Sequence, residues 1–178
     1  MKTQKKFKLL LLSLSMLVLS LNPACAQDDK SKRPSPAATA EAKVGDATVM
    51  INYSQPAVKD RTVWGELVPY GEVWRTGANE ATTFEVDKDV MIEDQKLPAG
   101  KYALFTIPAE DEWTIIFNSE SEQWGAYKYD ESKDVLRVKV KPAKAPEFSE
   151  RFKFDISKKG QVVMAWENLM VPFNVKKV

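Results

Sequence analysis

The chain contains no histidine and only one cysteine, Cys25, among its 178 residues. Histidine is the commonest group that takes and gives protons near neutral pH, so its absence excludes Ser-His-Asp and Cys-His catalytic machinery. A single cysteine cannot close an internal disulfide, and zinc sites of the Cys/His type are excluded as well. The composition therefore restricts catalysis to carboxylates, and any metal site to the oxygen ligands that bind calcium or magnesium.

Sequence motifs that mark common catalytic and cofactor sites are also missing. The chain has no G-x-S-x-G, S-x-x-K, P-loop or C-x-x-C-H string. The acidic run Glu110-Asp111-Glu112 and the pair Asp87/Asp89 do not follow a calcium-loop pattern, and we interpret them as solvated turn residues. The sequence thus indicates no metal and no cofactor, and it favours a protein that is not an enzyme.

The first residues have the pattern of an export signal. Four lysines precede an apolar stretch, Leu9 to Leu21, that is too short to span a bilayer and ends at Ala24-Cys25-Ala26. We expect residues 1–26 to be a signal peptide cleaved after Ala26, which makes the mature protein periplasmic or extracellular. A lipoprotein anchored through Cys25 is the weaker alternative, because Asn22 stands where a lipobox has an aliphatic residue.

The charge of the remaining chain limits its partners. Removing the four lysines of the signal peptide leaves 22 basic side chains against 25 acidic ones, with the two signs interspersed. Nucleic-acid binding needs a basic patch, so no nucleic acid is expected. No later segment is apolar enough to form a transmembrane span, and the sequence does not indicate an oligomeric state.

Short bursts of alternating apolar and polar residues predict an all-β fold with little helix. We expect residues 27–41 to be a flexible polar leader and residues 42–178 to form one antiparallel β-sandwich domain, jelly-roll-like in its connections. The segment 102–107 is apolar on nearly both faces, which predicts a central strand. The predicted strands are 47–53, 84–86, 90–92, 102–107, 113–118, 136–140, 148–156, 162–166 and 171–175.

The segment Val63–Val86 is unusually rich in tryptophan, glycine, arginine and asparagine for a connection between strands. Arg75 offers a planar fork of donors suited to a carboxylate or to paired hydroxyl groups, and Asn79 can both donate and accept. One interpretation is a ligand site lined by Trp74, Arg75, Asn79 and Glu80. The other is a buried Arg75–Glu80 ion pair that holds the connection in place, and the residues favour the two about equally.

Two further groups of residues are candidates for the same site. Lys59 and Arg61 form a polar cluster that joins the site if the loops gather at one end of the sandwich, although an ordinary charged loop accounts for them more simply. Trp64 and Trp124 lie with Trp74 in predicted loops, where aromatic faces can stack on sugars or pack under the loop.

Several strings in the chain resemble a family of secreted bacterial proteins, the domain of unknown function numbered twenty-nine-eleven. The most specific are WRTGANEAT, from Trp74, and LPAGKYALFTIP, from Leu97, and the resemblance extends from about Pro34 to Val178. Asp60 is a departure, because the family is expected to have glycine there in a Lys-Gly-Arg string. The resemblance implies a β-rich, exported, single-domain protein and implies no activity.

Three functions are compatible with these features. The first is a non-catalytic cell-envelope module that binds a small polar, anionic or glycan-like ligand at the Trp74–Glu80 loop. The second is a structural or partner-binding envelope protein in which that loop is scaffolding. The third is a carboxylate-dependent glycan hydrolase with Glu80 as its acid or base. The sequence places the first slightly ahead of the second and the hydrolase last.

Overall fold

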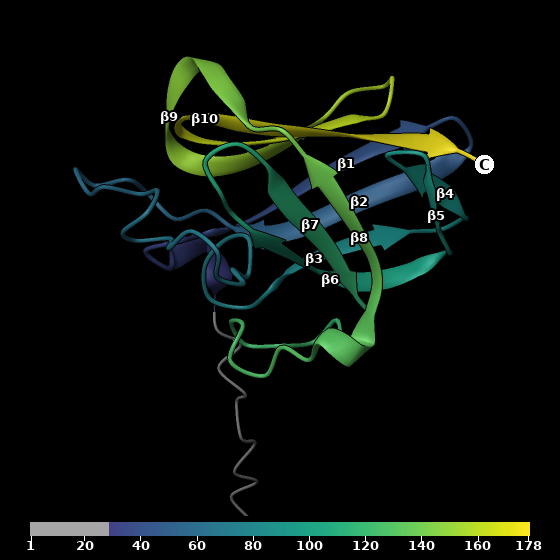
Figure 1. Cartoon of the computed structure of the whole chain (residues 1–178), viewed down its shortest axis with the longest axis horizontal. Coiled ribbons are helices and arrows are strands. Elements are labelled where there is room, and N and C mark those ends of the chain that lie inside the picture. The colour runs from purple at the N-terminus through teal and green to yellow at the C-terminus, as the bar shows by residue number, and fades with distance from the viewer. Residues whose placement is uncertain (1–28) are drawn as a thin grey trace, which may run out of the picture.

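The computed structural model of the protein describes residues 29–178. Within this range ten strands form two antiparallel sheets, with strand orders β1-β2-β3-β6-β7-β8 and β5-β4-β10-β9 (Figure 1). The strands are β1 (Ala37–Val44), β2 (Ala47–Ser54), β3 (Thr82–Val86), β4 (Val90–Ile92), β5 (Gln95–Leu97), β6 (Gly100–Ile107), β7 (Trp113–Asn118), β8 (Asp134–Val140), β9 (Ala143–Ile156) and β10 (Gln161–Lys177). The predicted all-β antiparallel fold is confirmed, whereas the jelly-roll detail stays a prediction.

Little helix is present among the described residues, as the sequence predicts. It consists of two short 3₁₀ turns, η1 (Lys30–Lys32) and η2 (Glu131–Lys133). Each turn is preceded by an aspartate, Asp29 or Asp130, whose side chain accepts a hydrogen bond from the backbone N–H two residues later. These caps satisfy donors that so short a helix leaves unpaired.

Alternation along the strands separates the core from the outer face of the six-stranded sheet. In β2, Val49 and Ile51 are fully buried between the sheets, while Asn52 is only partly buried on the opposite face. The main core fills the space between the two sheets and includes Phe84, Trp113, Phe117, Trp166 and Phe173. The fold therefore rests on apolar packing.

The central position predicted for 102–107 is confirmed, because β6 lies between β3 and β7. Its outward residues Ala103 and Phe105 are fully buried and join a second apolar cluster with Ala81 and Ile116. Side chains from the segment 119–133 pack over this cluster, among them Tyr129, whose ring meets that of Phe105 edge-on at 5.1 Å. One part of the outer sheet face is thus covered by a loop (Figure 1).

Two features of the strands differ from the sequence-based expectation. Strand β1 begins at Ala37, so the end of the expected leader belongs to the six-stranded sheet. Its inward residues are the small side chains Ala38, Ala40 and Ala42, which give only a weak hydrophobic signal. The segments 162–166 and 171–175 belong to one long strand, β10, which is irregular around Glu167 where the register shifts and φ is +58°.

The β2 side of the six-stranded sheet is joined to β9 of the other sheet. The Phe154 N–H donates to the Tyr53 hydroxyl at 3.1 Å, and the Phe152 N–H donates to the Pro56 carbonyl at 2.9 Å. These bonds connect the segment after β2 to β9, the edge strand of the four-stranded sheet. Part of that edge therefore has its backbone groups paired.

Candidate functional site

The tryptophans expected to wall a site, Trp64 and Trp74, pack into the core instead. The Trp64 ring meets those of Trp74, Trp113 and Trp166 edge-on, with centroids 5.9, 5.1 and 5.7 Å apart. The Trp74 ring stacks on that of Trp166 at 6.0 Å, and its indole N–H donates to the Gly77 carbonyl at 3.2 Å. The two tryptophans are therefore partly buried and stabilise the fold beneath the loop by packing against the core.

Arg75 does not form the ion pair with Glu80 that the scaffold interpretation requires. Its side chain is half-buried, and its Nε is buried without a hydrogen-bond partner among residues 29–178. The guanidinium lies close to the backbone of Gly125, where an added Cβ would come within 3.6 Å of Nη1. Arg75 thus lies against the 119–133 segment.

Glu80 pairs with the segment that precedes β1. The Arg33 Nη1 donates to both carboxylate oxygens, at 3.0 and 2.9 Å, and the Lys30 Nζ lies 2.9 Å from Oε1. Burial alone would raise the pKa of Glu80, but the hydrogen bonds from Lys30, its own backbone and Arg33 outweigh burial and lower the pKa to about 2. Glu80 is therefore a fixed anion at neutral pH.

Asn79 reinforces the same attachment. Its side-chain amide donates to the Ser35 carbonyl at 3.1 Å and to the Ser54 hydroxyl at 3.2 Å. Its backbone has φ +60°, a left-handed conformation that asparagine tolerates better than most residues. Asn79 and Glu80 together hold residues 30–35 against the sheet.

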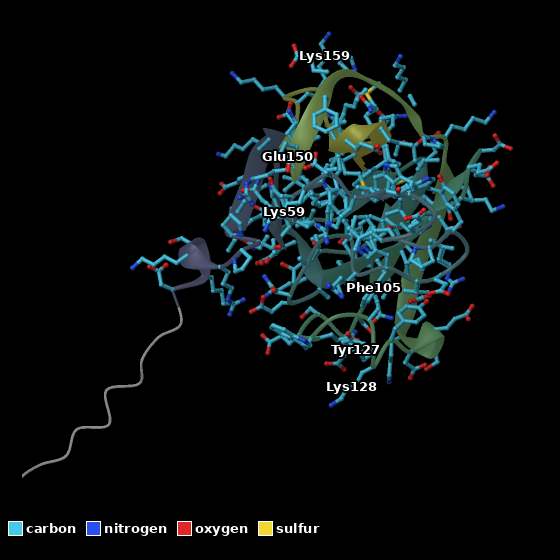
Figure 2. All side chains as sticks on the ribbon, turned by 90° about the vertical axis from the view of Figure 1, so that its left-hand side faces the viewer. Lys59, Phe105, Tyr127, Lys128, Glu150 and Lys159 are labelled. Atoms are coloured by element: carbon cyan, nitrogen blue, oxygen red, sulfur yellow. The ribbon has the colours of Figure 1, made fainter. Side chains whose placement is uncertain are left out.

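Lys59 and Arg61 lie in a different part of the structure. The Lys59 N–H donates to Glu150 Oε1 at 3.1 Å, and Figure 2 shows both residues away from Tyr127. The Arg61 guanidinium donates to the carbonyls of Val58 and Ala57, at 2.9 and 2.5 Å. Among the described residues neither side chain has a contact with Arg75 or Glu80. Their environment is that of a charged loop that stabilises its own backbone.

Asp60, where the family is expected to have glycine, keeps a left-handed turn. Lys59 and Asp60 have φ angles of +49° and +54°. Glycine adopts this conformation without steric cost, and aspartate is one of the few other residues that tolerate it. The departure from the family pattern is therefore compatible with the same turn.

A first pocket lies on the outer face of the six-stranded sheet. This first pocket has a volume of about 620 Å³. Its floor carries outward side chains of four adjacent strands, and its walls come from the N-terminal segment, the residues before β3 and the 119–133 segment. The floor residues include Thr39, Asn52, Thr83 and Lys101, and the wall residues include Lys30, Glu80 and Ser121–Trp124.

Polar groups in the first pocket are arranged for hydrogen bonding. The Thr39 hydroxyl donates to Asn52 Oδ1 at 2.8 Å, which orients the asparagine amide. Thr83 Oγ1 and Gln123 Oε1 are buried and have no hydrogen-bond partner within residues 29–178. Because buried polar atoms are nearly always paired, these two oxygens are exceptions among the described residues.

The wall made by the 119–133 segment is fixed by its backbone. The Ala81 N–H donates to the Gln123 carbonyl at 2.9 Å, and the Gly125 N–H donates to the Asn79 carbonyl at 3.1 Å. This pairing holds Trp124 beside Glu80 while the indole remains 60% exposed. Trp124, the third of the predicted loop tryptophans, is thus the one that presents an aromatic face to solvent.

A partly buried polar network anchors the far end of this segment. Asp134 accepts hydrogen bonds from the Tyr129 hydroxyl at 2.5 Å, Arg137 Nε at 2.7 Å and Asn118 Nδ2 at 2.8 Å. Burial, and next the hydrogen bond to Asp134, raise the pKa of Tyr129 to about 12. The network keeps the 119–133 segment closed over Phe105.

A second pocket, of about 530 Å³, lies within the 119–133 segment itself. It is lined by Glu120, Glu122–Trp124, Tyr127, Lys128, Asp130 and Lys133. Tyr127 is 84% exposed, and Figure 2 shows it with Lys128 at one end of the molecule. Glu80 and Trp124 were candidates from the sequence and line the first pocket. The strand residues that line it could not be selected, because an outward threonine or asparagine in a strand resembles any solvated position.

The described part of the chain gives no sign of two other kinds of site. No group of three or more acidic, histidine or cysteine side chains lies where it could hold a metal ion. No helix in residues 29–178 is long and apolar enough to cross a membrane. The expected signal peptide, residues 1–26, lies outside the described residues.

The fold and these pockets define an all-β sandwich-like protein with polar pockets on the outer face of one sheet and in the adjoining loop. The chain belongs to the family described as Protein of unknown function (DUF2911), whose model matches residues 35–175. No curated protein and no solved structure matches the chain. The family resemblance of the sequence is thereby confirmed, and it brings no activity with it.

Proposed function

We propose that the protein is an exported, non-catalytic module of the cell envelope that binds a small polar or glycan-like ligand in the first pocket. The observation that carries the proposal is the exposed indole of Trp124 beside a floor of hydrogen-bonding side chains. Sugars present apolar ring faces and hydroxyl edges, and an aromatic wall with polar partners matches both. The expected export signal supports placing the ligand in the envelope.

The charges of the first pocket favour an uncharged ligand over an anion. Lys30 and Lys101 are matched by Glu80 and Glu122, and Glu80 is already paired with Lys30 and Arg33. Two lysines and two glutamates give the lining no net charge, which does not select an anion. The Thr39 hydroxyl and the Asn52 amide on the pocket floor instead suit the hydroxyl groups of a polyol.

The scaffold function is supported only for the first half of the segment Val63–Val86. Trp64 and Trp74 form part of the core, so residues 63–76 serve the architecture, whereas Glu80 borders the first pocket. The hydrolase function has weaker support. A carboxyl group with a pKa of about 2, held by two cations, has no proton to donate near neutral pH and is a poor base.

Calorimetric titration with a panel of neutral mono- and disaccharides tests the proposal. The wild-type protein should bind at least one member of the panel, and Trp124→Ala should weaken that binding at least about tenfold. Phe148→Ala is the matched control, because Phe148 is 56% exposed and does not line the first pocket. Equal affinity of the Trp124→Ala variant and the wild type would refute the proposed site.

A further inference from the structure

The two pockets share a wall. Glu122, Gln123 and Trp124 line both of them, so the pockets adjoin at one short stretch of the chain. That stretch is fixed by its pairing with residues 79–81. We call residues 122–124 the ridge. A ligand in one pocket can reach the other by extending across this ridge.

Each of the two pockets is lined by an exposed aromatic side chain. Trp124 is on the ridge and lines both pockets, and Tyr127 lines only the second. The Tyr127 ring lies against the backbone of Gly125, where an added Cβ would come within 2.9 Å of Cε2. Because one side of the ring rests on Gly125 and the side chain is 84% exposed, Tyr127 offers an aromatic surface to solvent.

The second pocket carries charges of both signs, like the first. Lys128 and Lys133 are accompanied by Glu120, Glu122 and Asp130. Such a mixture does not select a strongly charged polymer. It is compatible with a neutral chain whose hydroxyl groups bond to carboxylates and ammonium groups alternately, and whose ring faces stack on aromatic side chains.

We propose that the ligand is a linear neutral oligosaccharide that crosses the ridge and places sugar units in both pockets, with Trp124 and Tyr127 as successive stacking surfaces. This inference rests on the proposed function and adds the length and chemical class of the ligand. Two linked sites on one rigid element bind a connected ligand more tightly than either binds a single unit, because the second contact is made at high effective concentration.

The test is a titration of the protein with a series of β-1,4-linked N-acetylglucosamine oligomers, from the monosaccharide to the hexasaccharide, and a parallel glucose series. We expect affinity to rise at least about tenfold between the monosaccharide and the longer oligomers of one series. Tyr127→Ala, which removes the second stacking surface, should abolish that rise, so that the longer oligomers bind no more tightly than the monosaccharide. Asn52→Ala, which alters only the first pocket, should weaken every member of the series.

The outcomes separate this inference from the proposed function. If the monosaccharide binds as tightly as the hexasaccharide and binding still depends on Trp124, the extended ligand is refuted and the proposed function stands. The same conclusion follows if Tyr127→Ala leaves hexasaccharide affinity unchanged. If neither series binds at any length, the extended ligand is refuted, and the proposed function fails with it only if no member of the mono- and disaccharide panel binds either. Phe148→Ala again serves as the control with an altered aromatic side chain outside both pockets.

Discussion

Glu80 makes its ion pair with Arg33, which precedes it by 47 positions, and not with its near neighbour Arg75. Together with Lys30, Arg33 attaches the N-terminal segment to the start of β3. Lys30 also lines the first pocket, so this attachment fixes part of the pocket wall. The polar residues Asn79 and Glu80 thus bind a segment that is distant from them in the sequence.

The Glu80 ion pairs should make stability depend on acid pH. Since the folded-state pKa of Glu80 is lowered from 4.5 to about 2, its contribution is fully present above pH 4.5 and is lost as pH falls towards about 2. Glu80 is more than a third exposed, so solvent screening limits the contribution to about 1 kcal/mol. Urea unfolding of wild type and Glu80→Gln at several pH values should show a difference near pH 6 that disappears near pH 2.

Two variants of the N-terminal segment test whether the Arg33–Glu80 ion pair holds that segment in place. Arg33→Ala should expose residues 30–35 to hydrogen exchange and proteolysis, whereas Lys32→Ala should not, because within residues 29–178 Lys32 pairs only with the exposed Asp29. Equal protection of the segment in both variants would show that the Glu80 pairs do not hold it.

Arg75→Met should leave the free energy of unfolding within about 1 kcal/mol of the wild-type value, because its guanidinium has no ion-pair partner among residues 29–178 and its Nε is buried unpaired. Breaking a buried ion pair would instead cost about 3–5 kcal/mol. Arg137→Met is the control, since Arg137 Nε donates to Asp134 at 2.7 Å, and it should lose about 1–2 kcal/mol. Chemical denaturation of both variants gives the comparison.

The fold was largely predictable from the sequence, and the site was not. Alternation in β2 and the two apolar faces of the segment 102–107 depend on local pattern, and burial follows that pattern directly. The partner of Glu80 depends on which distant segment the fold brings beside it. Trp74 and Trp124 have similar local sequences, each next to glycine or arginine in a loop, yet one packs on Trp166 and the other faces solvent. The local sequence does not indicate which of these two tryptophans packs on the core and which faces solvent.

Asp134→Ala should loosen the 119–133 segment as well as destabilise the protein. The Asp134 side chain is 8% exposed, and its removal leaves Tyr129 and Arg137 without their shared acceptor, at a cost of about 2–4 kcal/mol. Amide exchange in the segment should rise by more than in the rest of the protein. Glu131→Ala removes a 75% exposed partner of the same Arg137 and should change stability by less than about 0.5 kcal/mol.

Gly160→Ala should be among the most damaging substitutions in the chain. A Cβ at this position would lie 1.9 Å from the Val175 carbonyl oxygen, and φ is +86°. We expect a loss of more than about 3 kcal/mol by thermal or chemical unfolding. Gly71→Ala is the control, because φ is +76° there as well but no atom lies within 4 Å of the added Cβ. This variant should lose only the cost of the backbone conformation, about 1 kcal/mol of unfolding free energy. Similar losses in the two variants would contradict the clash with β10.

The most direct test of the binding account is an NMR titration of the isotopically labelled protein with the tightest-binding neutral saccharide of the panel. The account predicts that the Trp124 indole N–H and the signals of Asn52, Thr83 and Gln123 shift together and saturate at one affinity. Shifts confined to Lys59, Arg61 and the backbone of Arg75, with the Trp124 signal unchanged at saturation, would contradict it.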